Sequence, residues 1–135
     1  MVVSAGTKLA RFSLDSDDNT ADLDLFVYRG TTLVALSASG AADEQVTMLN
    51  PAAGTYNVYV NGFATPGGTT AYHQSNFVVP GTTVGNATVT PNPASVTSGT
   101  PVALTANWTG LDPAKRWLGL IEYSGATEVT VMSVG

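Results

Sequence analysis

Apolar and polar residues alternate along much of the chain with a period of two. Ala10, Phe12 and Leu14 share one phase, and the same alternation recurs over residues 23–27 and 56–60. Because successive side chains of a β-strand point to opposite faces, each run is typical of a strand with one buried face. No comparable stretch has the helical period of about 3.6 residues. The pattern therefore predicts strands throughout.

Turn-forming residues stand where the alternating runs stop. The chain has 14 glycines and 7 prolines, and many fall in turn sequences such as Ser39-Gly40, Pro66-Gly67-Gly68 and Ser124-Gly125. Strands at this spacing without helices between them favour antiparallel pairing. We expect an all-β chain of about ten short strands, folded as an antiparallel β-sandwich of the jelly-roll or immunoglobulin-like type.

A proline-rich connection indicates a boundary in the chain. Prolines at positions 80, 91 and 93 remove ladder donors and force extended backbone. We expect a β-sandwich over residues 1–82 and a β-rich C-terminal extension over residues 83–135. About fifty residues in four strands are marginal alone. The extension is therefore expected to dock on the first part or to resemble half an immunoglobulin-like unit, with Trp108 and Trp117 anchoring its core.

Charge and hydropathy exclude two classes of partner. The chain carries 10 acidic and 5 basic residues, a net charge of −5, and the basic residues are scattered. No basic stripe exists to neutralise phosphates, so nucleic acid is not an expected partner. The apolar runs are far shorter than the roughly 20 residues that cross a bilayer, so no membrane partner is expected either.

Catalytic chemistry finds little support in the sequence. His73 is the sole histidine, there is no cysteine, and no Gly-x-Ser sequence occurs. A serine nucleophile with its base is therefore not predicted, nor is a zinc site with histidine and cysteine ligands. We interpret His73 as a surface strand residue and expect no catalytic residue in this chain.

Five of the ten acidic residues fall within ten positions. Calcium takes oxygen ligands from carboxylates, carbonyls and backbone, which a turn followed by a strand supplies within a short sequence. The alternative is a solvated acidic turn held by bonds between side chains and backbone. The candidate calcium ligands are Asp15, Asp17, Asp18, Asp22 and Asp24.

Three aromatic residues stand in the phase opposite to the core. Phe26 and Tyr28 alternate with the apolar residues of their run, and Tyr59 does the same in a later run. Such a face can stack on sugar rings or bind an extended peptide. The alternative is that these rings form cross-strand pairs or are covered by other packing. Phe26, Tyr28 and Tyr59 are candidate ligand-surface residues.

Several segments together resemble one family. Residues 22–28 read Asp-Leu-Asp-Leu-Phe-Val-Tyr, residues 44–48 read Glu-Gln-Val-Thr-Met, and residues 50–60 read Asn-Pro-Ala-Ala-Gly-Thr-Tyr-Asn-Val-Tyr-Val, with glycine at position 62. In this order they resemble the pre-peptidase C-terminal domain, over about residues 7 to 80. Residues 108–111 and 116–123 look like the extreme C-terminal region of secreted bacterial subtilisin-like serine proteases.

The resemblance implies a non-catalytic accessory domain of a secreted, extracellular subtilisin-like protease, joined in cis to its catalytic domain. Its expected role is to assist stability, secretion or attachment to a protein or polysaccharide substrate. Some related collagenase modules bind calcium, and the resemblance maps Asp22 and Asp24 onto positions associated with calcium or with the acidic corner of the fold. The alternatives are a carbohydrate- or matrix-binding module of another secreted hydrolase and a purely structural spacer.

Overall fold

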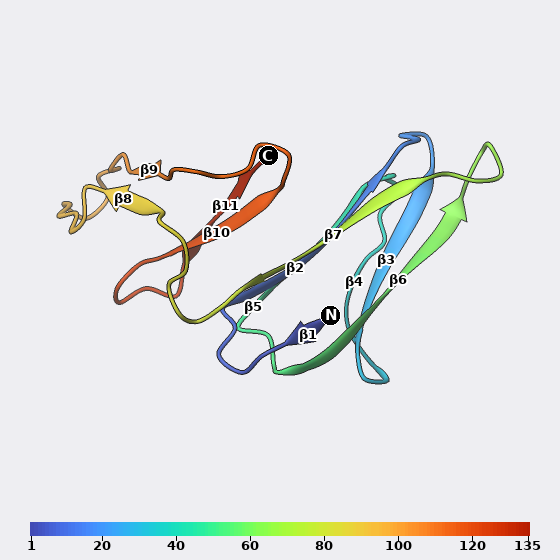
Figure 1. Cartoon of the computed structure of the whole chain (residues 1–135), viewed down its shortest axis with the longest axis horizontal. Coiled ribbons are helices and arrows are strands. Elements are labelled where there is room, and N and C mark those ends of the chain that lie inside the picture. The colour runs from blue at the N-terminus through green and yellow to red at the C-terminus, as the bar shows by residue number, and fades with distance from the viewer. The chain divides into compact units, whose positions relative to one another are not determined.

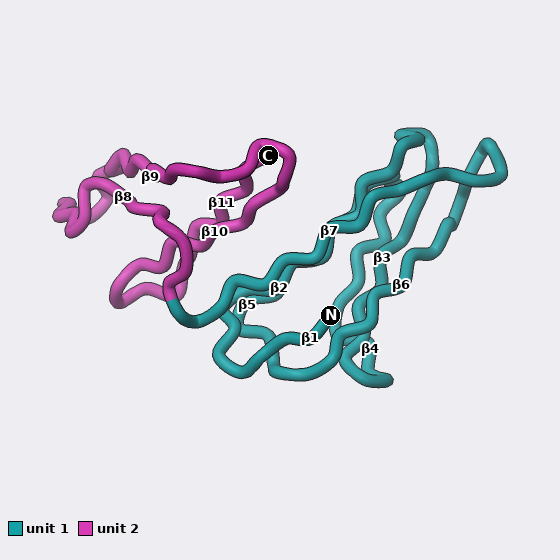
Figure 2. Tube along the Cα trace, in the orientation of Figure 1, with its two compact units in different colours: residues 1–82 teal, residues 83–135 magenta.

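The computed structural model describes residues 1–135 and consists of eleven β-strands without a helix (Figure 1). Every pair of neighbouring strands is antiparallel. The predicted all-β antiparallel fold is thus confirmed. No helix is present that could cross a membrane. The chain divides into two compact units, unit 1 with residues 1–82 and unit 2 with residues 83–135 (Figure 2).

Unit 1 is a sandwich of two sheets, which Figure 1 shows as two facing layers. The first sheet has the order β1-β6-β3-β4, formed by Val2–Val3, Gly54–Ala64, Asp22–Arg29 and Thr32–Ser37. The second has the order β5-β2-β7, formed by Glu44–Leu49, Leu9–Ser16 and Tyr72–Val79.

The core of unit 1 follows the period-two pattern of the sequence. Residues 10, 12 and 14 of β2 and residues 23, 25 and 27 of β3 are all buried and belong to one cluster. Phe12 stacks on Tyr56 with ring centroids 6.1 Å apart, and the Tyr56 hydroxyl donates to the Ala52 carbonyl at 2.8 Å. Each such large apolar side chain contributes about 1.5–3 kcal/mol by leaving water. The inward phases of the two sheets therefore hold unit 1 together.

A buried carboxylate fastens the two sheets where the chain crosses between them. Glu44 begins β5 and is 4% exposed, while Ser37 ends β4 in the other sheet. The Glu44 carboxylate accepts hydrogen bonds from the Ser37 hydroxyl and from both the backbone N–H and the hydroxyl of Ser39. Burial raises the pKa of Glu44, but these three bonds outweigh it and lower the pKa below its ordinary value.

The ends of unit 1 lie against each other. Lys8 donates its backbone N–H to Val79 at 2.9 Å, next to the paired residues Leu9 and Val79. A Cβ atom on Gly81 would lie 2.4 Å from the Gly6 carbonyl oxygen, closer than real Cβ contacts come. Glycine at position 81 therefore permits the close approach of the first loop and the last residues of unit 1.

Unit 2 consists of two separate two-stranded ribbons. β8 (Thr88–Thr90) pairs with β9 (Thr105–Asn107), and β10 (Trp117–Glu122) pairs with β11 (Val129–Val134). No residue of unit 2 is buried. Docking of this unit on the first, or half-immunoglobulin character, stays a prediction.

The expected core anchors of unit 2 are wrong. Trp108 is 40% exposed and Trp117 is 37% exposed, and the Trp117 indole N–H donates to the Asp112 carbonyl at 3.1 Å. Alternation shows which side chains share a face, but it does not supply a second layer to cover that face. Unit 2 has no such layer of its own, so its tryptophans form no core.

Candidate functional site

The outer face of the first sheet carries a row of apolar side chains. Leu36 on β4 lies directly opposite Phe26 on β3, and Phe26 lies directly opposite Tyr59 on β6. Directly opposed residues of antiparallel strands place their side chains on the same face. This row therefore runs across three strands, and its outer members are open to solvent, Leu36 being 52% and Tyr59 58% exposed.

A second pair adjoins this row. Tyr28 lies opposite Leu33, which is 41% exposed, across a bulge in the β3–β4 ladder. The rings of Tyr28 and Tyr59 meet edge to face with centroids 5.5 Å apart, which fixes the orientation of both. We call Phe26, Tyr28, Leu33, Leu36 and Tyr59 the outer platform.

The outer platform unites all three aromatic candidates of the sequence analysis. They do form cross-strand contacts, but those contacts leave much of Tyr59 exposed. Leu33 and Leu36 escaped the sequence analysis because Leu-Val-Ala-Leu at 33–36 is an unbroken apolar run. Such a run shows no alternation from which the exposed face could be read.

A groove lies beside β6. Its volume is about 380 Å³, and one wall is Met1 with residues 56–59 while the other holds Gln74 and Asn76 of β7. The Gln74 side-chain amide donates to the Asn76 side-chain oxygen at 3.1 Å. Tyr59 belongs both to this wall and to the outer platform, so groove and platform are adjacent surfaces.

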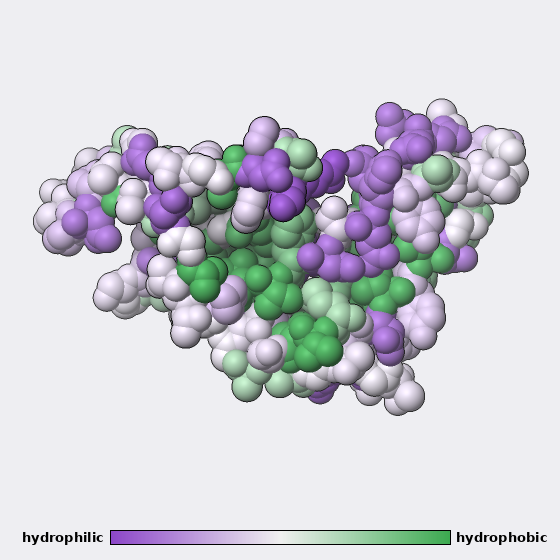
Figure 3. All heavy atoms as spheres, viewed as in Figure 1, coloured by the Kyte–Doolittle hydropathy of each residue, from purple (hydrophilic) through white to green (hydrophobic).

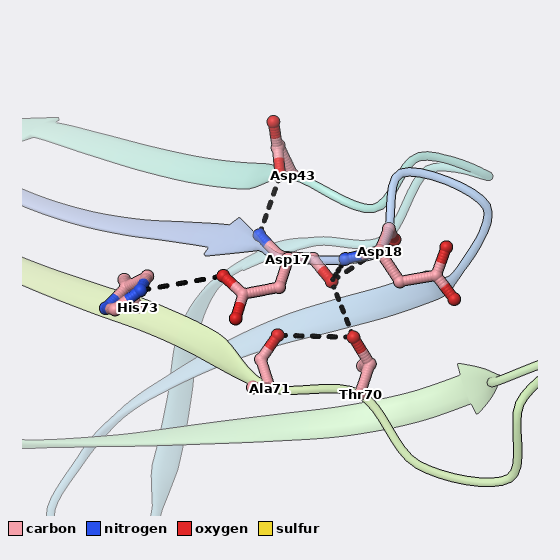
Figure 4. A network of polar contacts seen from close by, with 7 residues as sticks. Asp17, Asp18, Asp43, Thr70, Ala71 and His73 are labelled. Atoms are coloured by element: carbon pink, nitrogen blue, oxygen red, sulfur yellow. Dashed lines mark hydrogen bonds and ion pairs between the residues drawn. The ribbon is translucent and has the colours of Figure 1, made fainter.

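The acidic loop between β2 and β3 is organised by local hydrogen bonds (Figure 4). The carboxylate of Asp18 accepts from the Thr20 hydroxyl at 2.6 Å and from the Thr20 backbone N–H at 2.9 Å. These two bonds, the hydroxyl first, lower the pKa of Asp18. This arrangement is typical of an Asx turn, which the sequence analysis kept as the alternative to a cation site.

Residues at the ends of the neighbouring strands also contact this loop. The Ser16 backbone N–H donates to Asp43 at 2.9 Å, and the Ser16 hydroxyl lies 3.1 Å from that of Thr70. Asp17 lies 3.5 Å from the His73 imidazole, and both side chains are largely exposed. Figure 3 shows hydrophilic side chains gathered over this end of unit 1.

The five candidate aspartates do not form one cluster. Asp15 lies on β2 and Asp17 and Asp18 lie in the loop, while Asp24 of β3 is buried and accepts from the Asn61 side-chain amide at 3.0 Å. No three His, Asp or Glu side chains come together as a metal site would require. One oxygen, Oδ1 of Asp22, is buried without a hydrogen-bond partner, beside a bulge in the β3–β6 ladder.

Unit 1 is thus a two-layered antiparallel sandwich with a solvent-exposed apolar platform on one sheet. Residues 1–62 match the model of the bacterial pre-peptidase C-terminal domain, which confirms the resemblance seen in the sequence. Residues 1–62 of unit 1 are therefore similar to a domain family that is non-catalytic and occurs in secreted bacterial proteins. Comparisons with curated proteins and with solved structures gave no significant match.

Proposed function

We propose that this chain is the accessory part of a secreted subtilisin-like protease, and that unit 1 attaches the enzyme to protein substrate. The observation that supports this proposal is the outer platform. Of the five apolar side chains on three paired strands of the family-matched domain, Leu33, Leu36 and Tyr59 are exposed to solvent, and the other two are half-buried. Contiguous apolar patches on a secreted module are typical of binding surfaces.

The composition of the platform favours polypeptide. Tyrosine offers a large rigid contact surface with a polar tip, and leucine offers apolar contact without hydrogen-bonding groups. Sugar rings stack on flat aromatic faces, but here the Tyr28 and Tyr59 rings meet edge to face at an interplanar angle of 87°. Leu33 and Leu36 add aliphatic surface that suits protein side chains better than hydroxyl-bearing sugars.

The test compares retention on insoluble substrates. The chain is mixed with insoluble casein, fibrillar collagen, cellulose and chitin, and the fraction sedimenting with each solid is measured. We expect retention on the protein solids and none on the polysaccharides, without release of peptides. Retention on cellulose or chitin alone would favour the carbohydrate-binding alternative, and retention on no solid would favour the spacer.

We propose separately that calcium stabilises the acidic end of unit 1. The observation in favour is Asp22, whose Oδ1 is buried and has no partner, in a segment rich in carboxylates. Asp22 supplies one buried oxygen without a partner, and no three His, Asp or Glu side chains lie together. Ligands besides Asp22 would therefore have to move toward it.

A further inference from the structure

Two acidic residues border the outer platform along β3. Asp22 and Asp24 alternate with the buried residues Leu23 and Leu25, so they stand in the same outward phase as Phe26. By strand rise, Asp24 lies about 7 Å from Phe26 along β3. The apolar surface of the platform therefore ends, on this side, at carboxylates on the same face of the sheet.

The Asp24 side chain is mostly buried, but one of its oxygens is open. Asp24 is 8% exposed, and its Oδ2 accepts from the side-chain amide of Asn61, directly opposite on β6, at 3.0 Å. The one buried side-chain oxygen without a partner belongs to Asp22, so Oδ1 of Asp24, which accepts no hydrogen bond, is in contact with solvent. A carboxylate has about four acceptor sites. Asp24 therefore has unused acceptor capacity beside the platform.

No basic side chain on the outer face balances Asp24. Arg29 is the only basic residue in the strands of the first sheet. It lies opposite the buried Tyr56 and therefore stands in the inward phase. The other end of the platform is neutral, because Asn57 lies opposite Tyr28. The formal charges on this face thus have one sign and lie at one end of the platform.

From this arrangement we infer that the outer platform binds polypeptide segments that carry a lysine next to apolar residues, and that Asp24 selects the lysine. The apolar side chains pack on Phe26 and Tyr59, and the lysine ammonium donates to Oδ1 of Asp24. Such a charge-assisted hydrogen bond is roughly twice as strong as a neutral one, and it is stronger where little water surrounds the carboxylate. Lysine fits better than arginine, because the guanidinium fork binds both oxygens of a carboxylate and Oδ2 already accepts from Asn61.

The inference rests on the proposed attachment to protein substrate, since it names the side chain that the attached protein contributes. The carboxylates give the platform a preference among proteins, because basic side chains are attracted to this end and acidic ones are repelled. Calcium is not required for this contact. The test is therefore done in a chelator, which keeps a metal ion from occupying the carboxylates.

Two chemical forms of one substrate test the selection of lysine without altering the chain. Insoluble casein is either acetylated, which removes the charge of its lysines, or reductively methylated, which keeps that charge. Depletion isotherms of the full chain are measured on native casein and on both modified forms. We expect acetylation to weaken binding at least fivefold and methylation to change it less than twofold.

Variants of the chain assign the effect to Asp24. Asp24→Asn removes the charge and keeps an oxygen for the Asn61 amide. Asn61→Lys is a second variant at an exposed position, in which the chain itself supplies the cation opposite Asp24. The control is Asp15→Asn, which removes the same charge from the outward phase of β2 in the other sheet. Circular dichroism verifies the fold of each.

We expect Asp24→Asn and Asn61→Lys to bind native casein at least fivefold more weakly and to lose most of their sensitivity to acetylation, while Asp15→Asn behaves as the wild type. Equal sensitivity to acetylation in all of these proteins, or none in the wild type, would overturn the selection by Asp24 and leave the attachment role in place. No retention of the wild type on native casein would overturn the attachment role, and this inference with it.

Discussion

Glu44 and Ser39 are joined by two hydrogen bonds, because the Ser39 N–H and hydroxyl both donate to the same carboxylate oxygen, at 2.8 and 2.5 Å. The second oxygen of Glu44 accepts from Ser37 at the end of the opposite sheet. An ionised carboxylate accepts all three bonds without a hydrogen of its own to place, and bonds to a charged acceptor are stronger than bonds to a neutral one. The crossing from β4 to β5 is therefore held by one charged side chain.

Replacing Glu44 with Gln should destabilise the protein. The glutamine amide turns two donors toward a group that already donates, so at least one of the three donors loses its acceptor at the buried end of the side chain. We expect a loss of about 1–3 kcal/mol in the free energy of unfolding. Urea denaturation measures it, with Glu128→Gln as the matched control because Glu128 is exposed. Equal stability of the two variants would show that Glu44 does not fasten the sheets.

The same carboxylate should make stability depend on pH in the acid range. The pKa of Glu44 is lower in the folded state than in the unfolded chain, so its contribution is fully present above about pH 4.3, the ordinary value. It is lost as the pH falls through the lower folded pKa. The stability difference between the wild type and Glu44→Gln should therefore be full at pH 7 and narrow at pH 3. A difference that is constant over this range would contradict the assignment.

Tyr59→Ala should weaken attachment more than removal of an equally accessible tyrosine elsewhere. Tyr59 belongs to the outer platform, while Tyr72 on β7 is 46% exposed and lies outside it. We expect Tyr59→Ala to lower the affinity for insoluble casein by roughly tenfold, as central aromatic residues of interfaces do, and Tyr72→Ala to leave it within twofold. The measurement is a depletion isotherm, with circular dichroism to verify the fold. Equal losses in both variants would indicate non-specific adsorption.

Calcium should raise the melting temperature through Asp22 if the proposed cation site forms. We expect the midpoint to be higher in millimolar calcium than in a chelator, and Asp22→Asn to abolish that difference. Asp112→Asn serves as the control, since Asp112 lies in unit 2 and is exposed. An unchanged midpoint in the wild type removes the calcium proposal and leaves the acidic loop as an Asx turn.

The two units should differ when expressed separately. Every buried apolar residue belongs to unit 1, so residues 1–82 should unfold cooperatively on heating. Residues 83–135 bury no side chain, so we expect that fragment to give no cooperative transition. Calorimetry of both fragments decides this. A sharp transition of the second fragment would mean that its tryptophans find a core after all.

The alternating pattern of the sequence predicted the strands and the core of unit 1, but it predicted only some of the exposed residues of the candidate site. Residues 10–14 and 23–27 alternate because one face of each strand is apolar, and burial followed that alternation except at Asp24, which is buried in the opposite phase. Trp108 and Trp117 follow the same rule, yet they are exposed. Whether a second layer exists is decided by contacts between distant segments, which a local period cannot report.

The candidate site shows the same division. The alternation within single strands showed that Phe26, Tyr28 and Tyr59 point away from the core. Their proximity to Leu33 and Leu36 depends on the order and register of the strands, which the alternation does not give. The carboxylates of the acidic segment are divided between a loop and two strands and form no group of three. Calcium binding by this segment stays a prediction.

The contact of Gly6 with Gly81 has a mechanical consequence. This contact lies at one end of β2, and the acidic loop lies at the other end, about 25 Å away by strand rise. A force applied directly at these two glycines would pull the β2–β7 pair apart from Leu9 and Val79 onward, so its hydrogen bonds would break one after another and not together. The β2–β7 pair should therefore separate at a low force when it is loaded from this end.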